Sequence, residues 1–281
     1  MRNIKYLSKQ GAKIKPNEDK ITIIDGAAWV LDGATGITGK RITEKETDAL
    51  WYVEKINNYL IKNINSSKSL KDIMKSAIRE VKESYITYDG YKNLDEVDYP
   101  CAAIALVRFN NKELEYYVMG DCTLIYKEKD EKAVEIVDKR IIELEERILN
   151  SMVKVSKEKE VSILEARRYC DNEVLDVRKM KNKSNGYWIL ELNEEAIDNG
   201  LYGKIAISKE VSISLTSDGF SQYYDTFNLA EGYSEFIDIV KETNIDDLYN
   251  NLYLSQEDDS ECNNYPRLKK RDDSSIVYFE V

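Results

Sequence analysis

Several apolar segments with the character of β-strands end or begin on an aspartate. Such residues follow the segments 28–31, 117–119 and 213–215 and precede the segment 275–279; they are Asp32, Asp121, Asp218 and Asp272. One aspartate beside a glycine is ordinary turn chemistry, because glycine accepts positive φ and aspartate bonds to nearby backbone. Four of them at strand ends are a stronger constraint. In antiparallel sheets the end of one strand lies beside the start of its neighbour, so these carboxylates could share one edge.

The spacing of apolar residues divides the chain into strands and helices. It predicts helices that begin near Thr47 and Ser69, and further helices within 229–254. The predicted strands cover 3–7, 21–24, 28–31, 101–107, 115–119, 123–126, 186–190, 211–215 and 275–279, with a turn at 110–112. Strands that flank a helical pair and return through short turns indicate antiparallel sheets with helices on their faces, not a βαβ series. The predicted fold class is therefore α+β.

The organisation along the chain favours one domain over residues 1–281. No linker rich in proline, glycine or serine divides the 281 residues, and this length can bury a full core. The region at about 127–185 differs from the rest, because it is rich in charge and carries a single apolar stripe at helical spacing. We interpret it as a largely helical insertion that packs by one face.

Composition excludes several classes of function. The chain has no histidine, so a Ser-His-Asp triad, a Cys-His pair and a histidine zinc site are impossible. Its net charge of −11 argues against nucleic-acid and anionic-membrane partners. No export signal or membrane-spanning segment is evident, which predicts a cytoplasmic protein, and the four cysteines lack C-x-x-C spacing. Carboxylates would have to carry any chemistry, and oxygen ligands favour Mg²⁺, Mn²⁺ or Ca²⁺.

Convergence of Asp32, Asp121, Asp218 and Asp272 would itself imply bound metal. Carboxylates that lie close together repel one another and raise one another's pKa unless cations intervene. Two divalent ions that share a carboxylate can activate water and stabilise both the attacking and the leaving oxygen at phosphorus. The pattern thus predicts phosphoester hydrolysis without histidine.

The chain resembles the metal-dependent (type 2C) protein serine/threonine phosphatases in five segments that occur in that family's order. They are 17–19 (NED), 30–36 (VLDGATG), 118–122 (VMGDC), 215–219 (LTSDG) and 272–277 (DDSSIV). The resemblance spans nearly the whole chain. It implies a β-sandwich of two antiparallel sheets flanked by helices, with a binuclear Mg²⁺ or Mn²⁺ centre at one end.

The resemblance also implies a role for each matching residue. Asp32 would bridge the two metals, Gly33 would lend its backbone carbonyl, and Asp218 and Asp272 would complete the first metal's ligands. Glu18 and Asp19 match residues that hold metal-bound waters. Asp121 matches an aspartate that ligates a third ion in some bacterial members. Turn chemistry, a solvated loop and an edge-strand charge remain the structural alternatives for single residues.

The chain departs from the family pattern at its first motif. An arginine that holds substrate phosphate is often found four residues before the glutamate, where this chain has Ile14 between Lys13 and Lys15. An ammonium group can bind phosphate, but without the bidentate fork of a guanidinium. Lys13 and Lys15 are therefore candidate phosphate ligands. Asp273 is expected to be structural, and Cys122 stands where the family has serine.

These observations predict a cytoplasmic phosphatase that removes phosphate from serine or threonine of a phosphorylated protein, using two Mg²⁺ or Mn²⁺ ions. Two alternatives stay open: a phosphatase-like binding or signalling module with weak or no turnover, and a two-metal hydrolase of small phosphoesters. One local feature is unassigned. The polar turn at 182–186 leads into Tyr187 and Trp188, which we expect to pack in the core or to form a wall of the substrate cleft.

Overall fold

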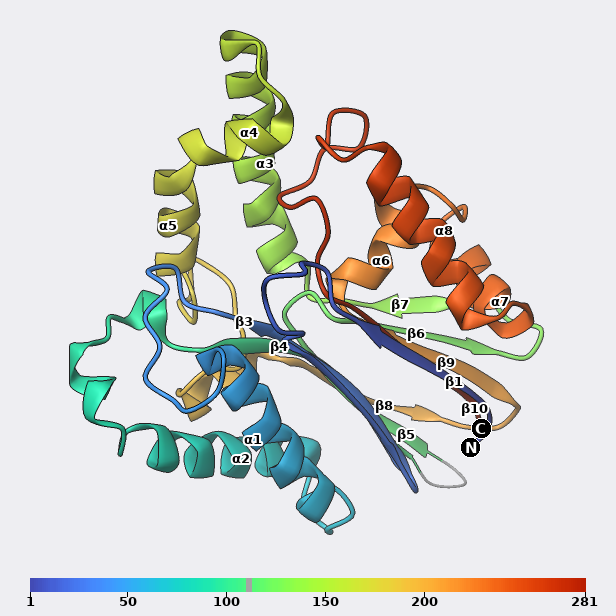
Figure 1. Cartoon of the computed structure of the whole chain (residues 1–281). Coiled ribbons are helices and arrows are strands. Elements are labelled where there is room, and N and C mark those ends of the chain that lie inside the picture. Colours follow the sequence, from blue (N-terminus) through green and yellow to red (C-terminus); the bar gives the residue numbers. More distant parts are fainter. Residues whose placement is uncertain (110–112) are drawn as a thin grey trace.

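The computed structural model describes residues 1–109 and 113–281. It consists of two five-stranded sheets packed face to face, and every neighbouring pair of strands is antiparallel (Figure 1). The turn expected at 110–112 lies outside the described residues. The first sheet has the order β1 (Arg2–Lys9), β10 (Ser274–Glu280), β9 (Val211–Thr216), β6 (Thr123–Glu128), β7 (Val134–Ile136). The second has the order β2 (Asp19–Ile24), β3 (Ala27–Ala34), β4 (Cys101–Phe109), β5 (Glu113–Met119), β8 (Leu201–Ala206).

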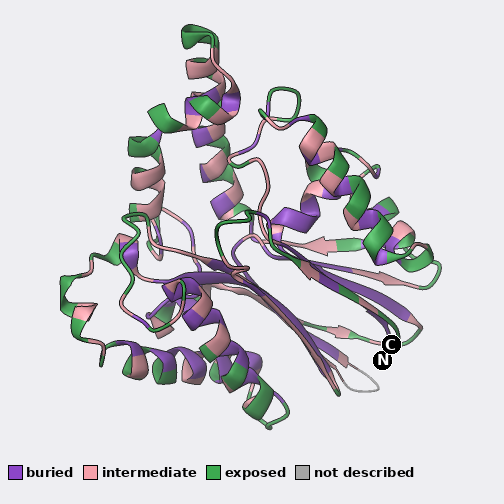
Figure 2. Ribbon diagram, viewed as in Figure 1, coloured by how far each residue is buried: buried purple, intermediate pink, exposed green. Residues whose placement is uncertain are grey.

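Alternation along the strands builds two separate layers of core. In β3, Val30 faces the other sheet and packs in a cluster with Leu215 and Val277, whereas Trp29 and Leu31 face the covering helices. All five side chains are buried, and in Figure 2 the middle strands of both sheets are mostly buried, whereas the edge strands β1, β2, β7 and β8 are mostly half-buried or exposed. A period of two explains why one strand serves two cores, since successive side chains point to opposite faces.

Helices cover the outer face of each sheet, as the resemblance implied. The second sheet is covered by α1 (Asp48–Asn63) and α2 (Leu70–Tyr85), and the first by α6 (Asp218–Asp225), α7 (Tyr233–Glu242) and α8 (Ile245–Asp258) (Figure 1). Both predicted helix starts are confirmed. The Thr47 hydroxyl accepts from the amide of Leu50 at 3.1 Å, and the Ser69 hydroxyl accepts from Asp72 at 3.2 Å. The predicted α+β sandwich is confirmed.

The charged region forms a helical unit that stands off one end of the sandwich (Figure 1). Residues 127–136 complete β6 and form β7, and α3 (Lys139–Lys159), α4 (Ile163–Ala166) and α5 (Asp171–Lys179) follow. These helices share a small apolar cluster with Cys262 and Leu268 from the segment before β10. Short 3₁₀ turns occupy Asp89–Asn93, Glu96–Asp98, Arg167–Tyr169 and Glu194–Asn199. In the described part of the chain, no helix combines the length and the apolar character that crossing a bilayer requires.

The strand predicted at 186–190 is wrong. This segment makes only two isolated bridges, between Lys181 and Tyr187 and between Ala102 and Leu190. Its alternation is real, because Tyr187 packs against the insertion while Leu190 packs under α1 and α2, but it lies between two cores and not in a sheet. The strand that pairs with β5 is instead β8. The sequence analysis missed β8 because its side chains are half-exposed and it contains Gly203, so it lacks a clear alternation of apolar and polar residues.

A polar side chain fixes α1 to the second sheet. Asn57 lies on the buried stripe of α1 with only 5 % exposure, and its Oδ1 accepts from Trp29 Nε1 at 2.9 Å and from Thr22 Oγ1 at 2.6 Å. The indole N–H is fully buried and has no access to water. A buried donor without an acceptor is costly, so this single amide oxygen stabilises the packing of helix on sheet.

We therefore predict that Asn57→Ala lowers the free energy of unfolding by about 2–4 kcal/mol, because it strands the Trp29 N–H and leaves a cavity. Chemical denaturation followed by tryptophan fluorescence measures this. Asn58→Ala is the matched control, since Asn58 is exposed on the same helix and should change stability by less than about 0.5 kcal/mol. Equal effects of the two substitutions would contradict the assignment.

Candidate metal centre

The register of the first sheet brings three of the predicted aspartates to one edge. Thr216, the last residue of β9, pairs with Ile276 of β10 on one side and with Thr123 of β6 on the other. The chain therefore leaves β9, enters β10 and enters β6 at the same end of the sheet. Three aspartates lie within four residues of these pairs: Asp121, Asp218 and Asp272.

The second sheet adds two more carboxylates to this edge. Asp19 at the start of β2 pairs directly with Asp32 near the end of β3. A hydroxyl connects the two sheets here, because Ser217 Oγ donates to Asp19 Oδ2 at 2.8 Å and accepts from the amide of Ser275 at 2.9 Å. The structure thus brings Asp19, Asp32, Asp121, Asp218 and Asp272 to one edge from four separate parts of the chain, Asp19 and Asp32 sharing the β2–β3 hairpin.

The electrostatics show that these carboxylates affect one another. Burial, followed by the negative charges of Asp19 and Asp218, raises the pKa of Asp32 well above its usual range. Burial and the charges of Asp272 and Asp121 similarly raise the pKa of Asp218, and burial is also the main cause that raises the pKa of Asp121. Such shifts mean that holding all these groups ionised together is costly without a compensating cation.

Asp19 is the most enclosed member of the group, with 5 % exposure. Burial raises its pKa to about 7, even though hydrogen bonds from Ser275 and Ser217 favour the ionised form. Its second oxygen, Oδ1, has no hydrogen-bond partner among the described residues, and neither has Oδ1 of Asp218. Two buried carboxylate oxygens are therefore available to a ligand.

Close backbone packing fixes the loops that carry the aspartates. A Cβ on Gly33 would lie 2.8 Å from the carbonyl oxygen of Glu18, and one on Gly219 would lie 2.1 Å from the carbonyl oxygen of Asp273. Asp273 itself accepts from two amides, those of Gly11 at 2.8 Å and Glu18 at 2.7 Å. It therefore fastens the loop 11–18 to the start of β10, which is the structural role expected for it.

The first motif is only partly drawn into the site. Glu18 is half-buried, and its Oε1 accepts a hydrogen bond from the hydroxyl of Thr35, three residues after Asp32. Lys13 and Lys15 are exposed, their ammonium groups have no hydrogen bond or ion pair with other described residues, and Ile14 is 95 % exposed. The structure thus leaves the two candidate phosphate ligands in a solvent-facing loop beside the aspartates.

Two charged side chains at this edge were missed by the sequence analysis. The ammonium of Lys269 forms an ion pair with Asp272 Oδ2, three residues along the chain. Glu145 reaches the site from α3 of the insertion; burial, followed by the charge of Asp121, raises its pKa to about 8, while Lys269 opposes the shift. Lys269 could have been noticed as the start of a basic run before Asp272, whereas nothing in the sequence places Glu145 here.

The donor set suits a hard divalent cation. It consists of carboxylate oxygens, two of them buried and unpartnered, in a region where negative charge is in excess. As the side chains stand in the described part of the chain, no three acidic or cysteine groups lie close enough to enclose an ion. Bound metal would therefore have to draw the carboxylates inward or use water for some of its ligands.

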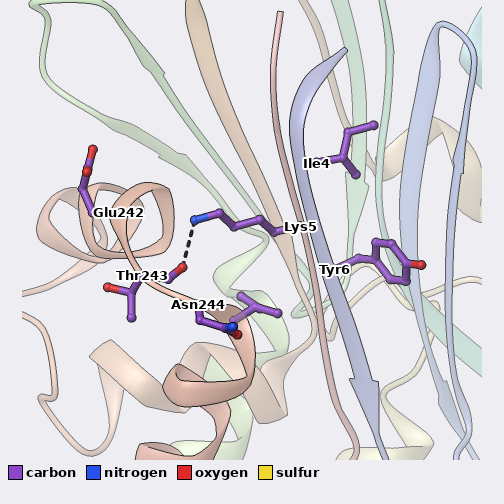
Figure 3. A pocket seen from close by; sticks show the side chains of 7 residues that line it. Ile4, Lys5, Tyr6, Glu242, Thr243 and Asn244 are labelled. Carbon is purple, nitrogen blue, oxygen red and sulfur yellow. Dashed lines mark hydrogen bonds between the residues drawn. The ribbon is translucent and has the colours of Figure 1, made fainter.

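A surface hollow of about 400 Å³ lies away from the carboxylates. It is formed by β1 and by residues 242–245, where α7 ends and α8 begins (Figure 3). Lys5 closes one wall, where its ammonium donates to the carbonyl oxygens of Val240 and Thr243, both at 2.8 Å. This contact caps the C-terminal end of α7, and none of the candidate carboxylates lines the hollow.

Comparison with known proteins identifies the architecture. No family model and no curated protein matches the chain. Solved structures do match: serine/threonine phosphatase Stp1 from Staphylococcus aureus (12 % identity, TM-score 0.58, covering 99 % of this chain and 94 % of that one), and the serine/threonine phosphatase PstP/Ppp of Mycobacterium tuberculosis (12 %, 0.57, 98 % and 97 %).

A further match is the catalytic domain of serine threonine protein phosphatase PstP in complex with two manganese ions. It is 11 % identical, has a TM-score of 0.55, and the alignment covers 98 % of this chain and 96 % of that one. At this identity the likeness concerns the path of the backbone. Over nearly its whole length, the chain has the fold of the bacterial type 2C serine/threonine phosphatases.

Proposed function

We propose that this protein is a metal-dependent serine/threonine phosphatase acting on phosphorylated proteins in the cytoplasm. The observation that carries the proposal is the gathering of five aspartates at one edge of a sandwich whose fold is that of such phosphatases. Carboxylates that raise one another's pKa have no structural advantage in being kept together, whereas they form a strong site for divalent cations.

The resemblance to the type 2C phosphatases assigns the candidate ligands. Asp32, the backbone carbonyl of Gly33, Asp218 and Asp272 would hold two Mg²⁺ or Mn²⁺ ions. Glu18 and Asp19 would hold water molecules around the ions, and Asp121 would hold a third ion. The bound ions would supply Lewis-acid activation of water and neutralise charge that develops at phosphorus.

The chain's own groups have further tasks. Ser217 and Asp273 hold Asp19 and the loop 11–18 in place, so the carboxylates are positioned before substrate arrives. Lys269 pairs with Asp272 Oδ2 and would compete with a metal for that oxygen. Lys13 and Lys15 are the candidates for holding substrate phosphate as exposed ammonium groups.

Loss of one ligand should abolish turnover. We expect wild-type protein with Mn²⁺ to hydrolyse p-nitrophenyl phosphate and a phosphothreonine peptide, and Asp218→Asn to lower kcat by about a hundredfold or more, since several kcal/mol of charge stabilisation is lost. Asp247→Asn, an exposed change of equal charge on α8, is the control and should retain activity.

The outcomes of this assay separate the candidate functions. Turnover that survives EDTA, or that Asp218→Asn leaves unchanged, would refute the metal mechanism. Tight Mn²⁺ binding without release of phosphate from either substrate would identify a binding module. Hydrolysis of p-nitrophenyl phosphate without hydrolysis of any phosphopeptide would indicate an enzyme for small phosphoesters.

The raised pKa values also predict how stability depends on pH. In metal-free protein, folded Asp19 keeps its proton up to about pH 7, whereas an unfolded aspartate loses it near pH 4. The folded state therefore binds more protons in this window, and its stability falls as pH rises from 4 to 7. We expect the Tm in EDTA to fall by about 5 °C between pH 5 and 7.5, and excess Mn²⁺ to reverse the loss.

Differential scanning fluorimetry measures this dependence. Asp19→Asn should flatten the decline of Tm with pH, because the amide has no proton to lose. Asp25→Asn is the control, since Asp25 lies exposed in the turn between β2 and β3 and should leave the slope unchanged. A metal-free Tm that rises from pH 5 to 7.5 would contradict the raised pKa values.

A further inference from the structure

A small basic pocket lies beside the candidate metal centre, in a chain whose net charge is −11. It has a volume of about 50 Å³ and is formed by the end of α5, the turn after it and the 3₁₀ turn at Glu96–Asp98. Four of its lining side chains are cationic and two are carboxylates: Arg178, Lys179, Lys181 and Lys183 against Glu96 and Glu191. The pocket is therefore a local site of positive charge on an acidic protein.

The floor of the pocket is rigid. Lys181 is only 7 % exposed, and its ammonium donates to the carbonyl oxygens of Glu96 at 3.0 Å and Tyr99 at 3.2 Å and forms an ion pair with Glu191. These contacts use the three N–H groups of Lys181, so this residue shapes the pocket and does not bind a ligand. Glu191 is neutralised by the same ion pair.

The cationic side chains at the mouth of the pocket have N–H donors that other described residues do not use. The ammonium group of Lys183 has no hydrogen-bond or ion-pair partner in the described ranges 1–109 and 113–281, and that of Lys179 has only an exposed partner, Asp176, at 3.3 Å. Arg178 makes two contacts, to the carbonyl oxygen of Thr35 and to Cys101 Sγ, which leaves several of its five N–H groups free. Guanidinium and ammonium groups in this arrangement suit an oxyanion such as a carboxylate or phosphate.

The turn that presents Lys183 is fixed in shape. Asn182 adopts a positive φ of 54°, and its backbone N–H donates to the carbonyl oxygen of Tyr187 at 2.8 Å. Its side-chain Oδ1 accepts from the backbone N–H of Ile189 at 3.0 Å. A side chain on Gly186 would lie 2.0 Å from the carbonyl oxygen of Met180. The unassigned 182–186 segment thus fixes the backbone that carries Lys183 at the mouth of the pocket.

A hydrogen bond connects Arg178 of this pocket to Thr35, which is close to Asp32 in the chain. Arg178 Nη2 donates to the carbonyl oxygen of Thr35 at 3.1 Å, and Thr35 lies three residues after Asp32 and donates to Glu18. The Cα atoms of Thr35 and Asp32 are thus at most about 11 Å apart, which an extended peptide spans in about three or four residues.

We propose that this pocket binds an acidic group on the substrate, two to four residues from the phosphorylated serine or threonine. The inference rests on the proposed function and specifies its substrate class: phosphoproteins with a carboxylate or a second phosphate close to the scissile one. The flanking oxyanion binds to Lys183, Lys179 and the free N–H groups of Arg178, and it positions the reacting phosphate over the aspartates.

Matched phosphothreonine peptides test this directly. In one peptide the positions two to four residues on either side are glutamate, in the second glutamine, and in the third phosphoserine; p-nitrophenyl phosphate has no flanks. Wild-type protein should have a lower KM for the acidic peptides than for the glutamine peptide, by about fivefold, the size expected for two exposed charge contacts. If the phosphoserine peptide has the lower KM, the natural partner of the pocket is a second phosphate. If the glutamate peptide has the lower KM, the natural partner is a carboxylate.

The variant Lys179→Gln/Lys183→Gln should remove this preference through KM while leaving kcat and the hydrolysis of p-nitrophenyl phosphate unchanged. Lys154→Gln/Lys157→Gln is the matched control, because it removes one lone lysine and one lysine paired with an exposed glutamate from α3 of the same insertion. The preference should also weaken with added salt. Equal KM values for the glutamate and glutamine peptides, or a preference that survives the pocket variant, would overturn the proposal.

A binding measurement keeps this test separate from catalysis. Fluorescence anisotropy with the labelled glutamate peptide on Asp218→Asn protein should show weaker binding when Lys179→Gln/Lys183→Gln is added, and no change with the control pair. If wild-type protein with Mn²⁺ releases no phosphate from any substrate, the proposed function fails, and the anisotropy alone decides whether the pocket binds acidic peptides. If Asp218→Asn protein binds the glutamate peptide equally well with and without Lys179→Gln/Lys183→Gln, the proposed pocket is refuted, whether or not the protein is a phosphatase.

Discussion

The mutual repulsion of five aspartates is the constraint on which the rest of this structure depends. Strand pairing brings the five residues to one edge, because Thr216 pairs with both β10 and β6 and Asp19 pairs with Asp32. Burial, followed by the charges of neighbouring carboxylates, raises the pKa values of Asp32, Asp218 and Asp19. Three apolar cores, one between the sheets and one under the helices on each outer face, supply the stability that offsets this local cost.

Several features reduce the cost or prepare the site for a cation. Hydrogen bonds stabilise two of the carboxylates: Ser217 donates to Asp19, and two backbone amides donate to Asp273. Lys269 forms an ion pair with Asp272. The unpartnered oxygens of Asp19 and Asp218 are left for a ligand. The edge of the sandwich is thus polar and ordered, yet its charge is incompletely balanced, which is the condition under which a divalent ion binds best.

The antiparallel sheets and their covering helices could be predicted from short-range patterns, whereas the sandwich of two sheets was implied by the resemblance to the type 2C phosphatases. Alternation in β3, the helical stripe of α1 and the caps at Thr47 and Ser69 are local signals. The strand expected at 186–190 failed because its alternation serves two cores without pairing, and β8 was missed because Gly203 and exposed side chains weaken its pattern. The positions of Glu145 and Arg178 depend on how α3 and α5 dock, and no local pattern encodes that.

The apolar cluster under the insertion has a consequence for how this protein tolerates change. Cys262 and Leu268 belong to the segment that ends at Asp272. Cys262 is buried and Leu268 partly buried in one cluster with α3 and α4, and the amide of Leu164 donates to the carbonyl oxygen of Glu261 at 3.2 Å. Removing the three helices would expose this segment to water and release the polypeptide that leads to Asp272. The helical unit α3–α5 is therefore needed to hold Asp272 in place, and deleting it would make the position of that carboxylate less fixed.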